Sequence, residues 1–467
     1  MRLPLIGGAY KGRSSNAASE EAINLFVETS STEQGEGALV NVPGSILFCQ
    51  LPVAEVRGMV KLHNYVYAVC GSNLYKIDEA GNYTDLGSIG TSSGPVSMCT
   101  NGAPYDQVAI ADGGSLKIYT SSTGVITNTG SANTSSVSQM DGYIIFTENG
   151  TGRWWWIFGG AIVIDGGDNQ WAEGDGDSCV GVKCDHRQIW IFGERTTEVY
   201  YNTGGATPFS KFQGGFNQSG CAAAATISRV GNSLMWLGKN EFGHAMPMGS
   251  SGYQAIPVAH DHPQVAWQMD QYATIADAFA YTYDYEGHAF YVLTFPSANV
   301  TWTYDVGAKH WHKRAHIINN TFPNRERYNC HTFAFEKHLV GDYADGKIYE
   351  LNSKYHTMNG TIIPNQRDTS GQQDKDEERI RVRSLQLAGE EGVGGSVFLS
   401  YSKDGGHTFS SELESSFGVI GKYAHRAIWR KLGHGRDWVF RIIRRYDGKT
   451  IYNGLIARKY GEEDKDN

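Results

Sequence analysis

The feature that most constrains the fold of this chain is a short phrase that recurs over its first 350 or so residues. A run of Val, Ile, Phe or Tyr is followed by a Gly, Asp or Asn turn and then by a second short strand. Residues 66–77, 108–119 and 339–351 are clear copies, and looser copies start near residues 144, 189, 234 and 290. The copies start about 36 to 56 residues apart, within or near the spacing of β-propeller blades. Because one hairpin cannot bury both faces and several around an axis can, we predict an all-β propeller of about six blades.

The composition also indicates an all-β chain. Its 467 residues include 57 Gly, 26 Tyr and 11 Trp but only 12 Pro, and aromatic strands separated by Gly turns are typical of β proteins. Only residues 263–278 fit a short amphipathic helix. We expect no transmembrane helix and no signal peptide, because no long apolar run occurs and the N-terminus soon turns polar. The seven Cys are scattered without C-x-x-C spacing, so we expect free thiols.

Changes in periodicity divide the chain into five segments. Strand-like residues at 397–401, 427–429 and 439–443, with Asp-Gly turns at 404–405 and 447–448, favour a second, smaller β domain that resembles a sandwich. The predicted segments are an N-terminal lead-in (1–50), the propeller (51–351), a polar linker or exposed loop (352–379), the C-terminal basic β domain (380–461) and an acidic tail (462–467).

Charge is unevenly distributed between these segments. Residues 379–460 contain 15 Lys and Arg against 7 Asp and Glu, a net charge of +8, so the remainder of a chain of net charge −9 carries −17. The cations could face nucleic acid or an acidic neighbouring subunit, or they could simply form a solvated β face. We favour protein contacts, because Arg pairs bidentately with carboxylates. The candidate adaptor or ring interface comprises Arg426, Arg430, Lys431, Arg436, Arg441, Arg444 and Arg445.

Three consecutive tryptophans, Trp154, Trp155 and Trp156, follow Arg153. In a strand the outer two would face one way and the middle one the other. They could pack between blades, or they could form an exposed aromatic patch on which another protein docks.

Residues 402–409 match the S-x-D-x-G-x-T-[WF] pattern of the Asp box found in sialidases. Asp404 can accept backbone N–H groups, the glycines permit positive φ, and Phe409 can anchor the turn. In sialidases this box is structural and lies away from the active site. One copy outside the repeats therefore indicates a turn and not a glycosidase.

Two histidine pairs, at 260 and 262 and at 310 and 312, would each share one face of an extended segment and could begin a metal site. No third and fourth ligand with recognisable spacing accompanies them, so structural histidines are favoured. We predict no catalytic, cofactor-binding or metal-ligating residues and no small-molecule substrate.

The order of several motifs resembles the packaged-DNA stabilization proteins of short-tailed bacteriophages, also called tail nozzle or tail hub proteins. Near the start these are residues 8–10, 13–14, 23–26, Glu28 and 42–44, followed by 191–193 with 197–200. The most specific stretch is 286–296 with 301–305 and 311–312, and the strand at 397–400, the turn at 404–405 and the basic residues 426–445 complete the resemblance.

This resemblance implies a non-enzymatic virion protein whose subunits form a hexameric ring. The ring would lie below the head-to-tail adaptor and portal, extend the DNA channel, retain packaged DNA and support its ejection. Tail fibres or spikes would attach at its periphery. Double-stranded DNA would pass without sequence-specific binding, and assembly would take place in the host bacterial cytoplasm.

Two other functions remain open from the sequence. A carbohydrate-active propeller, such as a sialidase or another glycosidase, would need paired carboxylates, or a Tyr–Glu pair with an arginine cluster. A host-glycan-binding tail tip could use Trp154, Trp155 and Trp156 as a stacking platform. The arginines of the propeller region are few and dispersed, and repeated Asp boxes are absent, so both are alternatives to the structural function.

Overall fold

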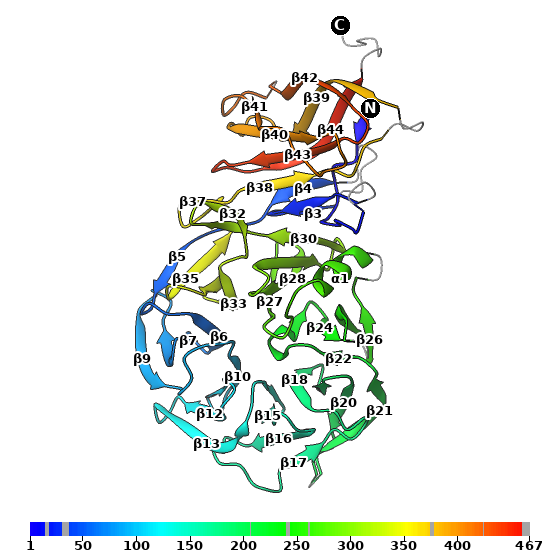
Figure 1. Ribbon diagram of the computed structural model, residues 1–467. Helices are drawn as coiled ribbons and strands as arrows, with labels where there is room; N and C mark the ends of the chain where they lie inside the picture. The colour runs from blue at the N-terminus through cyan, green and yellow to red at the C-terminus, as the bar shows by residue number, and fades with distance from the viewer. Residues whose placement is uncertain are drawn as a thin grey trace.

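The computed structural model describes residues 1–14, 18–29, 37–205, 207–239, 243–259, 262–373, 378–423 and 425–459. Figure 1 shows a ring of β-sheets and a smaller stack of strands beside it, with both ends of the chain at the stack. Within these ranges the helices are α1 (Pro263–Asp270) and one 3₁₀ turn, η1 (Ala224–Thr226), so the all-β prediction is confirmed. The helix predicted over 263–278 ends at Asp270. Neither helix has the length and apolar character needed to span a membrane.

The ring is a propeller of seven blades, each an antiparallel sheet of four strands, or of five in blade 5. Blades 1 to 3 are β6 (Val56–Leu62), β7 (Tyr65–Cys70), β8 (Asn73–Ile77) and β9 (Tyr83–Ser88); β10 (Ser97–Asn101), β11 (Gln107–Ala111), β12 (Ser115–Thr120) and β13 (Val125–Asn133); and β14 (Val137–Met140), β15 (Tyr143–Thr147), β16 (Arg153–Phe158) and β17 (Asn169–Trp171). Blades 4 and 5 are β18 (Cys179–Asp185), β19 (Gln188–Gly193), β20 (Thr197–Asn202) and β21 (Phe209–Asn217); and β22 (Gly220–Cys221), β23 (Ser228–Val230), β24 (Ser233–Lys239), β25 (Ala245–Ser251) and β26 (Gln254–Pro257). Blade 6 is β27 (Phe279–Tyr285), β28 (His288–Phe295), β29 (Val300–Asp305) and β30 (His310–Arg314).

Blade 7 explains why the predicted number of about six blades is wrong. It combines β33 (Tyr328–Ala334), β34 (Lys337–Asp342) and β35 (Lys347–Asn352) with β5 (Gly44–Gln50) from the N-terminal part of the chain. Leu351 pairs with Ser45, so the first and last strands of the ring are joined by hydrogen bonds. Each of the seven copies of the sequence phrase is the pair of middle strands of one blade, and the last copy becomes a full blade only because β5 supplies its outer strand.

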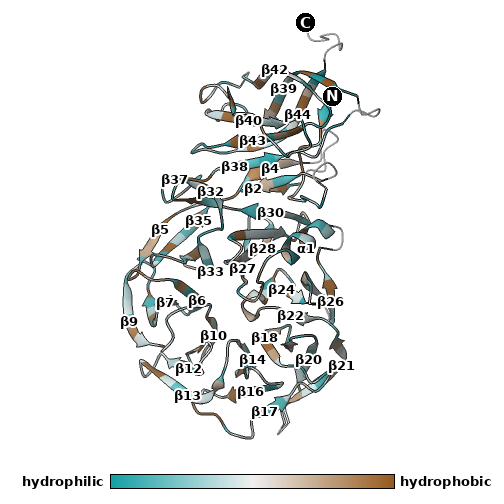
Figure 2. Ribbon diagram, viewed as in Figure 1, coloured by the Kyte–Doolittle hydropathy of each residue, from teal (hydrophilic) through white to brown (hydrophobic). Residues whose placement is uncertain are grey.

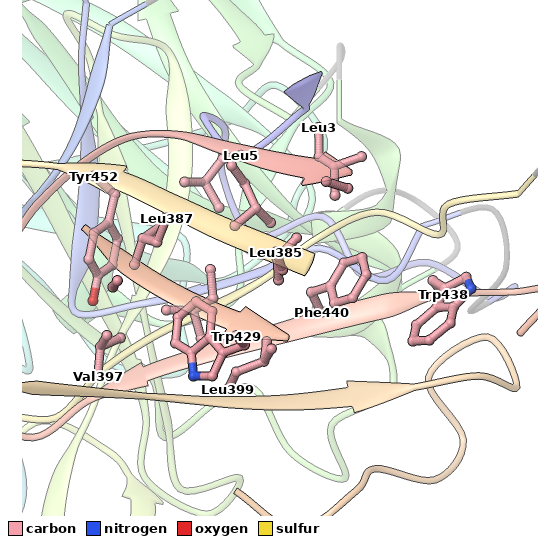
Figure 3. Close-up of a cluster of buried hydrophobic side chains, with 14 of the residues drawn as sticks. Leu3, Leu5, Leu385, Leu387, Val397, Leu399, Trp429, Trp438, Phe440 and Tyr452 are labelled. Atoms are coloured by element: carbon pink, nitrogen blue, oxygen red, sulfur yellow. The ribbon is translucent and has the colours of Figure 1, made fainter. Parts of the chain in front are cut away.

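The smaller part is a two-sheet sandwich that takes strands from both ends of the chain. One sheet contains β1 (Arg2–Leu3), β3 (Leu25–Glu28), β4 (Ala38–Asn41), β39 (Ile380–Gly389), β42 (Ala427–Gly435) and β44 (Ile451–Lys459). The facing strands are β2 (Glu21–Ile23), β38 (Asn365–Asp368), β40 (Ser396–Ser402), β41 (Leu413–Ser416) and β43 (Val439–Arg444). Leu3 and Leu5 lie in the same core as Trp429, Trp438 and Tyr452 (Figure 3). Each such buried side chain contributes about 1.5–3 kcal/mol of transfer free energy.

The structure differs from the predicted segments at both edges of the propeller. Residues 1–50 are not a separate lead-in, because β1, β3 and β4 belong to the sandwich and β5 closes the ring. Within the predicted linker over 352–379, all four residues of β38 are buried, and β36 (Thr357–Met358) and β37 (Thr361–Ile362) form a short hairpin beside β5. A second hairpin, β31 (His316–Ile318) with β32 (Thr321–Asn324), precedes blade 7. Residues 374–377 and the acidic tail 462–467 lie outside the described residues.

A nine-stranded sheet connects the propeller to the sandwich. Its order is β27-β28-β29-β30-β2-β38-β43-β40-β41, so blade 6 continues directly into one face of the sandwich. The join between the two parts is the parallel pair of β2 with β30, at Ile23 and Lys313, and β38 then pairs with both β2 and β43. The sandwich is therefore held on the propeller by main-chain hydrogen bonds.

Arg367 on β38 fixes the N-terminal segment to this sheet. Its side chain is 1% exposed, and its guanidinium donates to the carbonyl oxygens of Leu5 and Gly8 at 2.7 Å and of Glu21 at 3.3 Å. Hydrogen bonds from a cation to carbonyls are the usual way to satisfy a buried guanidinium.

The two parts use the same pattern of residues along their strands. Polar and apolar residues are interleaved over the propeller and over the sandwich (Figure 2).

All seven cysteines are unpaired, as the sequence predicted.

Replacing Arg367 by Met should lower the free energy of unfolding by about 3 kcal/mol, because buried carbonyl acceptors lose their donor. Urea unfolding of the full-length chain measures this loss. We expect the propeller and the sandwich to be destabilised together, because β38 lies in the sheet that joins them. Arg430→Met is the matched control, since Arg430 is exposed, and it should change stability by less than about 0.5 kcal/mol. An equal loss in both variants would contradict the assignment.

Candidate interaction surfaces

Three of the seven cations predicted at the interface are engaged within the sandwich. Arg441 on β43 makes a bidentate pair with Asp368 on β38, with Arg441 Nη2 2.7 Å and Nε 3.0 Å from Asp368 Oδ2. Its guanidinium also lies 3.8 Å from the ring centroid of Phe409. Arg444 is 1% exposed and donates to the Gly394 carbonyl at 2.8 Å. The burial of Arg444 contradicts its prediction as an interface residue, whereas Arg441 is partly exposed and its place in an interface stays a prediction.

Arg445 differs from both groups, because it is exposed but has a partner within the sandwich. It forms an ion pair with Glu412 at 2.7 Å on the surface, where the two side chains are 41% and 37% exposed. Exposed pairs of this kind contribute about 0–1 kcal/mol, so Arg445 could exchange this partner for another carboxylate.

The other four cations are exposed on or beside β42: Arg426, Arg430, Lys431 and Arg436. None of the four has an ion pair with a residue in the part of the chain that the structure describes. β42 is an edge strand of its sheet, and Lys431 has a φ of 62° at the point where its register with β39 shifts. Charged residues and a bulge on an edge strand prevent unwanted strand pairing, and they also leave the cations available to a partner.

An exposed apolar loop lies next to these cations, and sequence reasoning missed it. Val419, Ile420 and Tyr423, between β41 and β42, are 66%, 73% and 71% exposed. Phe417 at the base of the loop is buried in the sandwich core. The sequence does contain a signal for this loop. Two apolar residues lie between Gly418 and Gly421, and no alternating strand pattern surrounds them. We call residues 417–423 with 425 and 426 the sandwich loop. Clustered exposed apolar side chains of this kind mark interaction sites.

The tryptophan run is mostly interior. Trp154 and Trp156 are 0% and 3% exposed and pack with Tyr200 and Phe209 between blades 3 and 4. Their burial contradicts both the docking patch and the glycan-stacking platform at these two positions. Trp155 is partly buried, and its Nε1 donates to Glu148 at 2.9 Å. The exposed aromatic residues of this blade are Phe158 and Trp171, 51% and 44% exposed, which the run did not indicate.

The Asp box forms the turn that its pattern predicts. Asp404 accepts hydrogen bonds from Ser402 Oγ and Thr408 Oγ1, both at 2.6 Å, and from the backbone N–H groups of His407 and Thr408. The Ser402 hydroxyl is the largest contributor to a lowered pKa of Asp404. Phe409 is partly buried against Arg441 and lies outside the hydrophobic core cluster of the sandwich.

The histidine pairs serve packing. The His262 ring stacks on Tyr10 at 3.8 Å between centroids, and the Tyr10 hydroxyl is 2.7 Å from His310 Nδ1. His312 is 1% exposed, and burial lowers its pKa well below the usual value. His260 lies outside the described residues. Among the residues that are described, no group of three or more His, Cys, Asp or Glu could hold a metal ion.

A Tyr–Glu pair with an arginine does occur, between blade 6 and the segment that leads to blade 7. The Tyr281 hydroxyl donates to Glu326 at 2.7 Å, and Arg314 Nη1 lies 3.6 Å from the same carboxylate. Tyr281, Glu326 and Arg314 are 5%, 8% and 2% exposed. This is the residue set that a sialidase-like site would need, but one buried arginine closed off from solvent cannot receive a sugar carboxylate.

Two family models match the chain. The model described as Bacteriophage P22 Gp10, beta-propeller, matches residues 1–356, and the model described as Bacteriophage P22 Gp10, beta-sandwich, matches residues 370–456. No curated protein sequence matches the chain.

Several solved structures are similar to part of the chain at low identity. Virginiamycin B lyase from Staphylococcus aureus has 12% identity and a TM-score of 0.44 over 65% of this chain and 98% of its own. The N-terminal domain of Nup159 has 9% identity and a TM-score of 0.42 over 70% and 97%. The WD40 propeller domain of Doa1 has 11% identity and a TM-score of 0.40 over 66% and 97%.

Arg441 on β43 and Arg445 directly after it should respond differently to substitution. Arg441→Met leaves the buried Asp368 carboxylate without its cation and should cost about 2 kcal/mol of stability, less than for a fully buried pair because Arg441 is 31% exposed. Arg445→Met breaks only the exposed pair with Glu412 and should cost less than about 1 kcal/mol. Thermal unfolding of the two variants provides the comparison. Equal stability of the two would show that the Arg441–Asp368 pair does not stabilise the sandwich.

Proposed function

Because the chain belongs to the bacteriophage P22 Gp10 family, whose propeller and sandwich models match 1–356 and 370–456, we propose that it forms the nozzle or hub ring of a short phage tail. The family is one of phage structural tail proteins, and the chain is such a protein. The finer role is to extend the channel below the portal and adaptor, to retain packaged DNA and to support its ejection.

The observation that carries the proposal is the match of both domain models in chain order. The connection between the two parts supports it further. A sandwich hydrogen-bonded into blade 6 keeps a fixed position relative to the propeller. A subunit of this kind can hold neighbours on two sides at a defined spacing, which a ring in a tail requires.

The sandwich offers the more suitable surface for the adaptor or for a neighbouring subunit. The sandwich loop provides exposed Val419, Ile420 and Tyr423 together with Arg426, and Arg430, Lys431 and Arg436 follow it on β42 and directly after that strand. An apolar centre with polar and charged surroundings is the usual anatomy of a protein interface. These exposed cations would select an acidic partner.

The remaining roles concern DNA and the outer tail proteins. A self-assembled ring, hexameric in this proposal, would surround double-stranded DNA, which passes without sequence-specific contact. The net charge of −17 over the residues outside 379–460 repels phosphates and would reduce friction during ejection. Fibres or spikes would bind at the periphery of the ring. Assembly would take place in the host bacterial cytoplasm, and no small-molecule substrate or catalytic step is part of this role.

Electron microscopy of particles made with and without the protein tests this role directly. We expect the purified protein, or the protein with its adaptor, to form rings. Particles that lack it should have no nozzle below the adaptor and should lose their DNA. Normal tails and full retention of DNA in its absence would contradict the proposal.

Reversing two exposed cations, Arg426→Glu with Arg430→Glu, should lower incorporation into virions at least tenfold while the melting temperature stays within a few degrees. The expected reason is repulsion between the new carboxylates and an acidic partner. Quantitative immunoblotting of purified particles measures the occupancy. The matched control is a double reversal of exposed lysines on the propeller side, Lys61→Glu with Lys354→Glu, which should leave occupancy unchanged. Wild-type occupancy of the Arg426/Arg430 variant would place the contact elsewhere.

A further inference from the structure

The centre of the propeller contains a cavity of about 750 Å³. All seven blades contribute to its walls through their innermost strands and the adjoining loops. Its volume lies within the range of about 300–1,000 Å³ that is typical of sites for small molecules. Small residues, including Gly94, Gly113 and the run Ala222–Ala225, keep part of this space open.

The charged groups on its walls are unbalanced. Arg57, Lys183 and Arg229 face a single carboxylate, Asp112, among the residues that line the cavity. Two of the four groups are already paired with residues outside the lining. Asp112 accepts an ion pair from Lys117 at 2.9 Å, and Arg229 pairs with Asp185 at 3.2 Å. Arg57 and Lys183 have no carboxylate of a described residue within 4 Å.

Arg57, on β6 of blade 1, is a fixed positive charge. It is 3% exposed, and its guanidinium donates to the carbonyl oxygens of Gly71, Thr91, Ser93 and Gly94 and to the Thr91 hydroxyl, at 2.7 to 3.0 Å. These contacts hold the group in place without cancelling its charge.

Lys183, on β18 of blade 4, is the cation available to a ligand. It is only partly buried and lies in the cavity wall, and no hydrogen bond or ion pair from its ammonium group to a described residue is formed. Burial lowers its pKa, and Cys99 and Cys184 are among its neighbours. Blades 1 and 4 lie on opposite sides of the ring, with β6 and β18 facing across its centre in Figure 1. Cations that are removed from water without a counter-charge are costly, and a bound anion would offset that cost.

We propose that the central cavity of the propeller binds a small polyanion, carrying phosphate or carboxylate groups, which Lys183 contacts directly while Arg57 supplies a fixed positive charge from the opposite wall. The residues that line the cavity all belong to the propeller, so the proposal rests on this cavity and not on the sandwich surface. It therefore does not depend on the proposed tail function.

Isothermal titration calorimetry of the full-length protein at about 0.05 M salt tests the site with two probes, inorganic tripolyphosphate and citrate. We expect saturable binding of at least one probe, weakening as salt is raised because the attraction is screened. Binding of tripolyphosphate alone identifies a phosphate-bearing ligand, and binding of citrate alone identifies a carboxylate. Lys183→Met should weaken binding at least tenfold, and Lys61→Met, at an exposed lysine outside the cavity, should not change it.

A second variant keeps the test valid if Lys183→Met fails to fold. Asn149 also lines the cavity, and Asn149→Asp adds a negative charge there with almost no change in size. We expect it to weaken binding several-fold, and more at low salt than at high salt. If neither probe binds the wild-type protein, or if folded Lys183→Met binds as tightly as wild type, the proposal is wrong.

Discussion

The hydrogen bonds that join β30, β2, β38 and β43 are the interaction on which the rest of the structure depends. They turn blade 6 and one face of the sandwich into a single nine-stranded sheet. The buried guanidinium of Arg367 fixes the N-terminal segment to this sheet by donating to three of its carbonyl oxygens. Without these contacts β2 would have no place between the two parts. The remaining contacts between the two parts would be packing such as that of Phe26 on Phe290 and the hydrogen bonds between Asn24 and Ala315.

This arrangement divides the basic residues of the sandwich into two groups. Arg441 and Arg444 stabilise the domain, because each is held by a partner within it. The cations beside β42 have no such partner among the described residues, and the sandwich loop exposes apolar side chains next to them. A net charge of +8 therefore does not describe one surface. Only the exposed cations without a partner can contribute to recognition. The cations that are paired within the domain contribute to its stability.

The propeller shows the same distinction between the presence of a chemical group and its availability. Tyr281, Glu326 and Arg314 together have the residue types of a glycosidase site, but they are sealed between elements of the scaffold. The tryptophans of blade 3 have the composition of a binding platform, but two of the three fill the space between blades. In contrast, Lys183 lines the central cavity, where the carboxylate of Asp112 is already paired with Lys117. Burial and pairing thus decide which groups can meet a ligand.

The sequence by itself determined the elements that rest on local patterns. The repeated strand–turn–strand phrase predicted the propeller, because alternation and Gly turns act within about a dozen residues. The Asp-box turn and the strands of the sandwich followed for the same reason. Only the tertiary structure decided the number of blades, the place of residues 1–50, the burial of Trp154 and the pairing of Arg441. These depend on strands that meet across hundreds of residues, such as β5 with β35 and β1 with β44. A local pattern predicts which side chains share one face of a strand, but it does not predict which strand pairs with it or packs on it. Those neighbours decide which side chains are buried.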